Sequence, residues 1–233
     1  MQTGGSQKFR NYHHSHPLKD DGFVNADQVE KRVLYYFLKR IFDELLSIIA
    51  IILLIPVFIV IAILIKFDDP KGPIFYSQIR IGRNGHPFKM YKFRSMVTNA
   101  DKRLKPLLKY NEVGGAMFKI KSDPRVTRIG KIIRKYSVDE LPQLLNVIKG
   151  DMALVGPRPP LRREVREYTK YDKQRLLVVP GCTGLWQVSE RNNVGFHEMV
   201  KLDIEYIIHA SLWLDVRILS KTIWIMFFPN DAY

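Results

Sequence analysis

Residues Leu45–Ile65 read LLSIIAIILLIPVFIVIAILI, a run of 21 residues without one charged side chain, on which the interpretation of the whole chain depends. A straight helix of this length would extend about 31 Å, close to the thickness of the hydrocarbon core of a bilayer. The run is longer than the roughly 7 to 15 apolar residues of a secretory signal, and no small-x-small cleavage site follows it. We therefore expect a membrane segment that stays in the mature protein.

Two features favour a re-entrant helix over a single membrane span. Pro56 lies in the middle of the run, where it removes a backbone donor and its ring clashes with the carbonyl of Ile52, so a kink is expected there. Basic residues flank both ends, which by the positive-inside rule places both ends on the cytoplasmic side. These residues are Lys31, Arg32, Lys39 and Arg40 before the run, and Lys66, Lys71, Arg80 and Arg83 after it. A single span remains the alternative.

The remainder of the chain is strongly basic. The 233 residues are 46% hydrophobic and 26% charged, which argues against a disordered protein, and they carry a net charge of +14. Residues 66–233 hold 30 basic and 17 acidic side chains, so the excess lies after the membrane run. Nucleic acid, anionic lipid and a phosphate-rich substrate all suit this charge. The single cysteine, Cys182, excludes an internal disulfide and a thiolate zinc site.

Local patterns predict a mostly helical chain with one β-hairpin. Residues 1–28 are predicted to be a flexible polar tail. His13, His14 and His16 in this tail could bind a metal ion, but a histidine cluster in an unstructured tail is more often incidental. The Asn84-Gly85 pair between two β-rich runs predicts a hairpin with a type I′ turn. The other predicted elements are helices over 29–43, 96–110, 137–148, 161–171 and 196–210, strand and turn over 176–188, and a final helix over 211–228. That last helix is apolar enough to be either a core helix or an interfacial one.

The start of the helix at Ser137 carries two adjacent carboxylates. Ser137 and Glu140 have the spacing of a capping box, in which Glu140 would only fold back onto the first amide. Asp139 lies at the second helical position, where free amides favour an ionised carboxylate. An ionised carboxylate beside cations can attack phosphorus, and its neighbour can hold a divalent ion. Both interpretations are compatible with this spacing.

One cation is presented more rigidly than the others. In Gly156-Pro157-Arg158-Pro159-Pro160 the prolines restrict the backbone on both sides of Arg158, which indicates ligand contact. Further cations lie at turns or element ends, where they could converge on a diphosphate. These are Lys92, Arg94, Arg125, Arg128, Arg134 and Arg191.

Six ordered motifs, within residues 35–228, resemble the bacterial sugar transferases, the monotopic polyprenyl-phosphate phosphoglycosyl transferases that prime polysaccharide synthesis. The motifs are Phe75–Gly82, Lys92–Met96, Asp139–Leu144, Gly156–Pro159, Pro180–Gly184 with Trp186, Gln187 and Arg191, and Trp213–Asp215. In this family the re-entrant helix usually bends at a Ser-Pro pair, whereas Ile55 precedes Pro56 here.

The resemblance implies transfer of a sugar 1-phosphate from a UDP-sugar, such as UDP-glucose or UDP-galactose, to undecaprenyl phosphate with release of UMP. It implies that Asp139 is the nucleophile of a covalent phosphosugar intermediate and that Asp139 and Glu140 hold Mg²⁺. The implied substrate- and phosphate-binding residues are Lys92, Arg94, Arg158, Arg191 and Asp215. The implied location is the inner cell membrane, with the catalytic domain on the cytoplasmic face.

We therefore predict an α+β, mostly helical monotopic membrane protein with a re-entrant helix bent at Pro56, a small β-hairpin and interfacial amphipathic helices. Residues 1–28 form the tail, 29–66 the amphipathic and re-entrant helix, and 67–233 the catalytic domain. The expected partners are a UDP-sugar, undecaprenyl phosphate and the bilayer, with no nucleic acid, and a homo-oligomer is left open. The alternative is a membrane-tethered basic protein that binds nucleic acid or acidic lipid without catalysis.

Overall fold

The computed structural model describes residues 23–100, 102–110, 120, 123–189 and 195–228. Its α-helices are α1 (Ala26–Glu30), α2 (Val33–Asp68), α3 (Arg128–Lys135), α4 (Leu144–Lys149), α5 (Arg162–Arg166), α6 (Leu185–Ser189), α7 (Phe196–His209) and α8 (Leu212–Phe227). Short 3₁₀ helices are η2 (Arg83–Gly85), η3 (Lys105–Tyr110), η4 (Val138–Gln143) and η5 (Asp172–Leu177). The strands are β1 (Phe75–Ile81), β2 (Pro87–Phe93), β3 (Ala153–Val155) and β4 (Gly181–Thr183). The prediction of a mostly helical α+β chain is confirmed.

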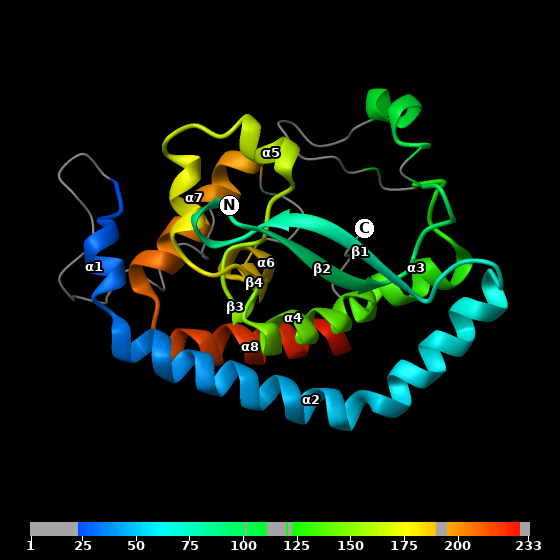
Figure 1. Ribbon diagram of the computed structural model, residues 1–233, viewed down its shortest axis with the longest axis horizontal. Coiled ribbons are helices and arrows are strands. Elements are labelled where there is room, and N and C mark those ends of the chain that lie inside the picture. The colour runs from blue at the N-terminus through cyan, green and yellow to red at the C-terminus, as the bar shows by residue number, and fades with distance from the viewer. Residues whose placement is uncertain (1–22, 101, 111–119, 121–122, 190–194, 229–233) are drawn as a thin grey trace, which may run out of the picture.

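Helix α2 forms the lower edge of the molecule and bends partway along its length (Figure 1). The helix passes through Pro56 without interruption, and a proline inside a helix is the usual cause of such a bend. Among the described residues α2 is the helix long and apolar enough to cross a membrane, and only 11% of its most apolar part is buried. Its exposed side chains include Ile48, Ile49, Ile52, Leu53, Ile55, Val57, Ile59, Val60, Ile63 and Leu64.

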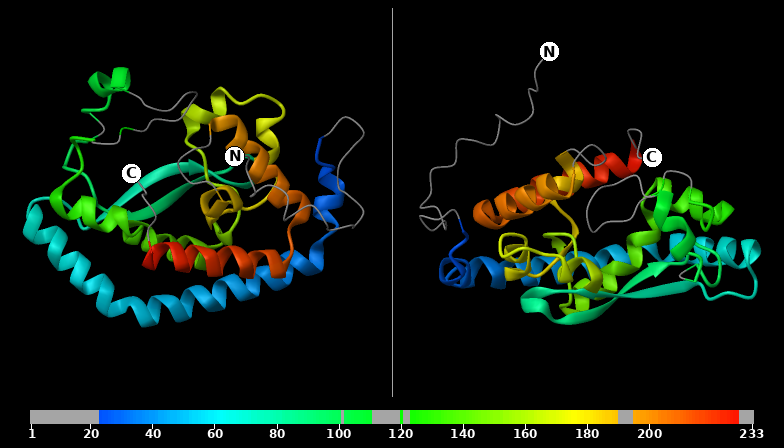
Figure 2. Two further views of the ribbon diagram at one scale, coloured as in Figure 1. Left: turned by 180° about the vertical axis from the view of Figure 1, so that it is seen from behind. Right: turned by 90° about the horizontal axis from the view of Figure 1, so that it is seen from above.

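The N-terminal half of α2 is fixed to the domain by a buried network of charged and phenolic groups. The Lys39 ammonium lies 3.0 Å from Asp215 of α8 and 3.3 Å from Asp43. The hydroxyls of Tyr35 and Tyr206 also donate to Asp215, at 2.9 and 2.7 Å. We call Tyr35, Lys39, Asp43, Tyr206 and Asp215 the anchor network. It joins α2 to α8, which lies beside this half of α2 in Figures 1 and 2.

The C-terminal half of α2 packs on the same domain through an apolar cluster. Ile61 and Ile65 are buried against Phe93 of β2 and Ile133 of α3. Each half of α2 thus has a few buried residues that pack on the domain, whereas the apolar side chains in the middle of the helix are mostly exposed.

The predicted hairpin is confirmed. Strands β1 and β2 pair antiparallel, from Phe75 opposite Phe93 to Ile81 opposite Pro87. Asn84 and Gly85 both have positive φ, 55° and 83°, and the His86 amide donates to the Arg83 carbonyl at 3.2 Å, as a type I′ turn requires.

A second, smaller sheet lies in the main core. Strands β3 and β4 pair in parallel, with Ala153 opposite Gly181 and Val155 opposite Thr183. Around them α4, α6, α7 and α8 bury an apolar core that includes Val155, Val200 and Ile207. The predicted helices over 196–210 and 211–228 appear as α7 and α8.

Helix α8 packs in the domain through one of its faces. Ile218 is buried in the main core, whereas Trp213, Trp224 and Phe227 are exposed by 62%, 63% and 74%. The part of α8 in the core is therefore confirmed, and a position of its exposed aromatic face at the membrane interface stays a prediction.

Other expectations were wrong or incomplete. The helix over 96–110 is absent: Asn99 has a left-handed backbone (φ 67°), and of the range only η3 is helical. The helix over 161–171 shortens to α5. The predicted tail is outside the described residues up to residue 22, but Val24 is buried and its amide donates to Gln174 at 2.6 Å, so its end belongs to the fold.

Candidate functional site

The hairpin brings Lys92 of β2 against the carboxylates at the start of η4. The Lys92 ammonium lies 2.5 Å from Oε1 of Glu140, although 48 residues separate the two in sequence. Both side chains are partly exposed, so the pair lies at the surface of the domain rather than inside it. Asp139, the neighbour of Glu140, is 94% buried beside them, since only 6% of its surface is exposed. We call Lys92, Asp139, Glu140, Arg134 and Arg158 the carboxylate cluster.

The predicted capping box is wrong. Ser137 adopts a left-handed conformation (φ 55°) and its side chain caps no amide. The Glu140 carboxylate is bound by Lys92 instead of folding back onto the start of the helix. The following helix ends as predicted, with Gly150 at φ 85° in the C-cap position. The strained turn at Ser137 thus serves to direct Glu140 toward Lys92.

A buried asparagine sets the position of Lys92 relative to the helix. Asn146 of α4 is fully buried; its Oδ1 accepts from the Tyr91 amide at 3.0 Å, and its Nδ2 donates to the Lys89 carbonyl at 2.7 Å. These two bonds satisfy backbone groups on the edge of β2 that does not pair with β1, and they fix the strand against α4. Because the main chain next to Lys92 is held, its ammonium reaches Glu140 at little further entropic cost.

The two carboxylates have opposite pKa shifts. Burial raises the pKa of Asp139 to about 6; the ammonium of Lys92 opposes this, the charge of Glu140 adds to it, and Arg134 opposes it. Burial alone would also raise the pKa of Glu140, but Lys92, Arg158 and Arg80 outweigh it and lower that pKa. At neutral pH both groups are ionised, and Asp139 is the more basic of the two. A buried carboxylate with a raised pKa is a stronger nucleophile than an exposed one.

Arg158 and Arg134 supply further positive charge. The guanidinium of Arg158 makes no hydrogen bond or ion pair with the described residues, although its loop is fixed. Arg134 of α3 donates from Nε to the Ser95 hydroxyl at 2.9 Å, and it acts electrostatically on Asp139. The cluster therefore offers cationic groups beside a buried carboxylate, which suits a phosphate-bearing substrate.

Two predicted site residues lie outside the carboxylate cluster, and a third is not among the described residues. Arg94 is buried and donates to Asp69 and to the Pro73 carbonyl, so it closes the loop that follows α2. Asp215 belongs to the anchor network and not to the carboxylate cluster. Arg191 lies outside the described residues. Contact of these three residues with substrate stays a prediction.

Arg80 was not predicted as a site residue, although it acts electrostatically on Glu140. Gln78 and Arg80 are two residues apart on β1, so their side chains lie on the same face, and this spacing was the signal available in the sequence. Its neighbours come from a distant loop, which no local pattern reveals.

The side chains of the carboxylate cluster supply only some of the oxygen ligands that a magnesium ion needs. Among the described residues no group of three or more His, Cys, Asp and Glu side chains could enclose a metal ion. Asp139 and Glu140 provide two carboxylates, and Mg²⁺ is commonly held by one or two carboxylates together with substrate phosphates and water. The residues present therefore fit a magnesium ion that arrives with a diphosphate.

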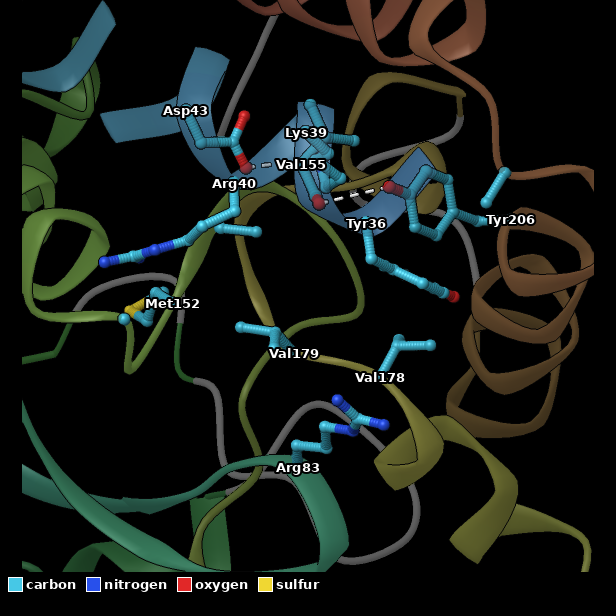
Figure 3. A pocket seen from close by; sticks show the side chains of 13 residues that line it. Tyr36, Lys39, Arg40, Asp43, Arg83, Met152, Val155, Val178, Val179 and Tyr206 are labelled. Carbon is cyan, nitrogen blue, oxygen red and sulfur yellow. Dashed lines mark hydrogen bonds and ion pairs between the residues drawn. The ribbon is translucent and has the colours of Figure 1, made fainter. Parts of the chain in front are cut away.

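A cavity of about 210 Å³ lies elsewhere, between α2, β3 and the segment before β4 (Figure 3). Its lining includes Tyr36, Lys39, Met152 and Val178. Arg83 points toward it from the hairpin turn. No residue of the carboxylate cluster lines this cavity, so the cavity is separate from the predicted site.

Comparison with known proteins agrees with the motifs. A family model described as bacterial sugar transferase matches residues 34–229. The chain is 51% identical over 162 residues to galactosyl transferase CpsE of Streptococcus agalactiae, covering 69% of this chain and 36% of that protein. It is 45% identical to the undecaprenyl-phosphate galactose phosphotransferase of Salmonella typhimurium (84% and 42%) and 46% identical to the exopolysaccharide production protein ExoY of Sinorhizobium fredii (84% and 88%). The chain thus spans less than half of the first two relatives.

Proposed function

The chain belongs to the bacterial sugar transferase family, and from this we propose that it transfers a sugar 1-phosphate from a UDP-sugar to undecaprenyl phosphate, releasing UMP. Glucose or galactose is the proposed sugar, and the step would initiate exopolysaccharide, capsule or glycoconjugate synthesis. The observation that carries the proposal is the buried Asp139, with its raised pKa, in a cluster with Lys92 and with an Arg158 guanidinium that has no partner among the described residues. The names of two relatives, a galactose phosphotransferase and an exopolysaccharide production protein, support it.

The proposed reaction is a double displacement at the β-phosphorus. An Asp139 oxygen bonds to that phosphorus while the bond to the bridging oxygen breaks, and the bridging oxygen leaves with UMP. A phosphate oxygen of undecaprenyl phosphate then bonds to the same phosphorus, and the aspartyl–phosphorus bond breaks to restore the carboxylate. Lys92 and Arg158 offset the negative charge that develops on the phosphoryl oxygens.

Magnesium is proposed as the cofactor. Asp139 and Glu140 would hold it, and when bound it would neutralise charge on the diphosphate and favour departure of UMP. Lys92 keeps Glu140 ionised, and therefore able to act as a ligand, by lowering its pKa.

We further propose that α2 enters the bilayer and returns to the same, cytoplasmic face of the inner membrane. Its two halves pack on one domain, through the anchor network and through Ile61 and Ile65, while its middle is exposed and apolar. Single cysteines introduced at Glu30 and Lys71, in a Cys182→Ser background, test this topology with a membrane-impermeant reagent. We expect both to react only from the cytoplasmic side, and reaction from opposite sides would overturn the proposal.

The activity is tested by UMP release from the purified full chain in detergent, with UDP-glucose, UDP-galactose and their N-acetylated counterparts as donors. We expect release that requires Mg²⁺, and a phosphosugar adduct on Asp139 detectable by mass spectrometry when the acceptor is omitted. Asp139→Asn is the control and should form no adduct. A protein that binds anionic lipid in a salt-dependent manner but releases no UMP would instead be the membrane-tethered binding protein considered above.

A further inference from the structure

The loop that presents Arg158 is fixed by hydrogen bonds to the backbone carbonyls of residues 157–160, each of which accepts one. Prolines 157, 159 and 160 have no amide hydrogen, so carbonyl oxygens are their only backbone polar groups. The four bonds are Gly181 N to Pro157 O (2.9 Å), Arg175 Nη2 to Arg158 O (3.3 Å), Arg80 Nη1 to Pro159 O (3.0 Å) and Ile81 N to Pro160 O (2.9 Å). Two buried arginines, Arg80 and Arg175, thus support the backbone on which Arg158 stands.

These two arginines differ in how their charge is balanced. Arg175 forms an ion pair with Asp203, in which both side chains are almost completely buried, and its charge is neutralised. Arg80 is also buried, with 6% exposed, but no described carboxylate lies within ion-pair distance of it. Its partners are neutral: the Pro159 carbonyl and the Gln78 side chain, at 3.0 and 2.9 Å.

Arg80 also has an unused donor. Its Nε is buried and has no partner among the described residues, whereas both terminal nitrogens are bound. A buried cation without a counterion is costly, so the retention of Arg80 calls for an explanation.

The neighbour on which Arg80 acts is Arg158. Burial lowers the pKa of Arg80 to about 10, and the positive charge of Arg158 lowers it further, while Glu164 and Glu140 oppose this. Arg80 therefore stays protonated at neutral pH and repels Arg158. Because the Arg158 carbonyl is held by Arg175, this repulsion would act mainly on the Arg158 guanidinium, which has no partner among the described residues. The charge of Arg158 in turn acts on Glu140, which places the two residues in one electrostatic neighbourhood.

We propose that Arg80 is a positioning residue for the donor diphosphate: it holds the Pro159 carbonyl and, through its unbalanced charge, sets Arg158 for an incoming anion. This inference rests on the proposed transferase function and adds to it a specific residue outside the predicted site. Arg80 acts through Arg158 and through the positive potential of the site, without contact with the reacting phosphorus.

The test compares Arg80→Gln with Arg80→Lys and with the matched control Arg83→Gln. Arg83 lies on the same hairpin and is about half exposed, and its ion-pair partner among the described residues is Glu30, at 3.9 Å. Its substitution therefore removes the same charge at a position away from the Arg158 loop. Two quantities are measured on the full chain in detergent: the KM and kcat of UMP release with UDP-galactose, and the Kd of UDP by calorimetry.

We expect Arg80→Gln to raise both the KM and the Kd about tenfold with kcat changed less than about threefold, since diphosphate binding is lost equally from the ground and transition states. Arg80→Lys should raise the KM and the Kd about threefold, because lysine keeps the charge but cannot bond both Pro159 and Gln78 as the guanidinium does. Arg83→Gln should change them less than twofold. The salt dependence of kcat/KM should also weaken in Arg80→Gln, which a purely structural defect would not produce.

Unchanged KM and Kd in Arg80→Gln would overturn the inference while leaving the transferase function intact. If wild type binds UDP but releases no UMP, the proposed function fails, and a weaker Kd in Arg80→Gln still supports the role of Arg80 in anion binding. If Arg80→Gln does not fold, Arg80→Lys decides: values within 1.5-fold of wild type would overturn the inference.

Discussion

The anchor network and the carboxylate cluster each contain a buried carboxylate, but the charged groups of the first are more fully paired. In the anchor network each Asp215 oxygen accepts a hydrogen bond, and Lys39 lies between two carboxylates. In the carboxylate cluster the Arg158 guanidinium has no hydrogen-bond or ion-pair partner among the described residues. Satisfied charges hold elements together, whereas unsatisfied charges are available to a ligand. The comparison separates residues that fasten α2 from residues that are available for reaction.

The largest effect is expected from removal of the nucleophile. Asp139→Asn should lower UMP release by at least about 10³-fold, because the amide cannot form the covalent intermediate. The protein should still fold, as judged by circular dichroism and size exclusion. Activity of Asp139→Asn within tenfold of wild type would show that Asp139 is not the nucleophile.

Removal of one partner from the anchor network should act on stability. Lys39→Met leaves Asp43 and Asp215 buried without their cation and should lower the free energy of unfolding by about 3 to 5 kcal/mol. Urea unfolding in detergent measures the change. Lys201→Met is the matched control: its ion pair with Glu198 is half exposed, so a change within about 0.5 kcal/mol is expected. Equal changes in unfolding free energy in the two variants would show that the anchor network does not stabilise the fold.

The pH dependence of the rate should report Asp139. Because burial raises its pKa to about 6, kcat/KM should be constant above that pH and fall about tenfold per unit below it. Lys92→Met removes a group that lowers this pKa, so the midpoint should move to higher pH. A profile flat down to pH 4.5 would contradict the assignment.

The smallest effect concerns the free energy of unfolding, which the buried, ionised carboxylate of Asp139 lowers at neutral pH. A carboxyl whose folded pKa is raised stabilises the fold at low pH, and this contribution is lost as the pH rises through about 6. Asparagine does not titrate, so Asp139→Asn should unfold like wild type near pH 4 and be more stable by about 1 to 3 kcal/mol at pH 7.5. Thermal melts at the two pH values measure the difference, and a less stable variant at pH 7.5 would contradict it.

Local signals in the sequence predicted the parts of the fold that local interactions determine. Asn84-Gly85 specifies its turn through positive φ, and the apolar periodicity of α7 and α8 is long enough to be unambiguous. The helix over 96–110 failed because Asn99 leaves the helical region, and the capping box failed because Lys92, distant in sequence, competes for Glu140.

The candidate site was predicted in composition but not in arrangement. Asp139, Glu140, Lys92 and Arg158 were identified from their motifs, and the structure places Lys92 against Glu140. The pairing of Asp215 with Lys39 depends on the docking of α8 beside α2, over 176 residues of separation, which periodicity cannot reveal. The support that Arg80 gives to Pro159 is likewise a tertiary contact across 79 residues.

The docking of Ile61 and Ile65 on Phe93 and Ile133 has a consequence for biogenesis. The segment that contains Ile61 and Ile65 leaves the ribosome before β2 and α3 have been synthesised, so its packing partners are absent at first. The C-terminal half of α2 can therefore reach its final position only after the chain has been extended through α3. In the topology proposed above, α2 would have to remain at the membrane until then.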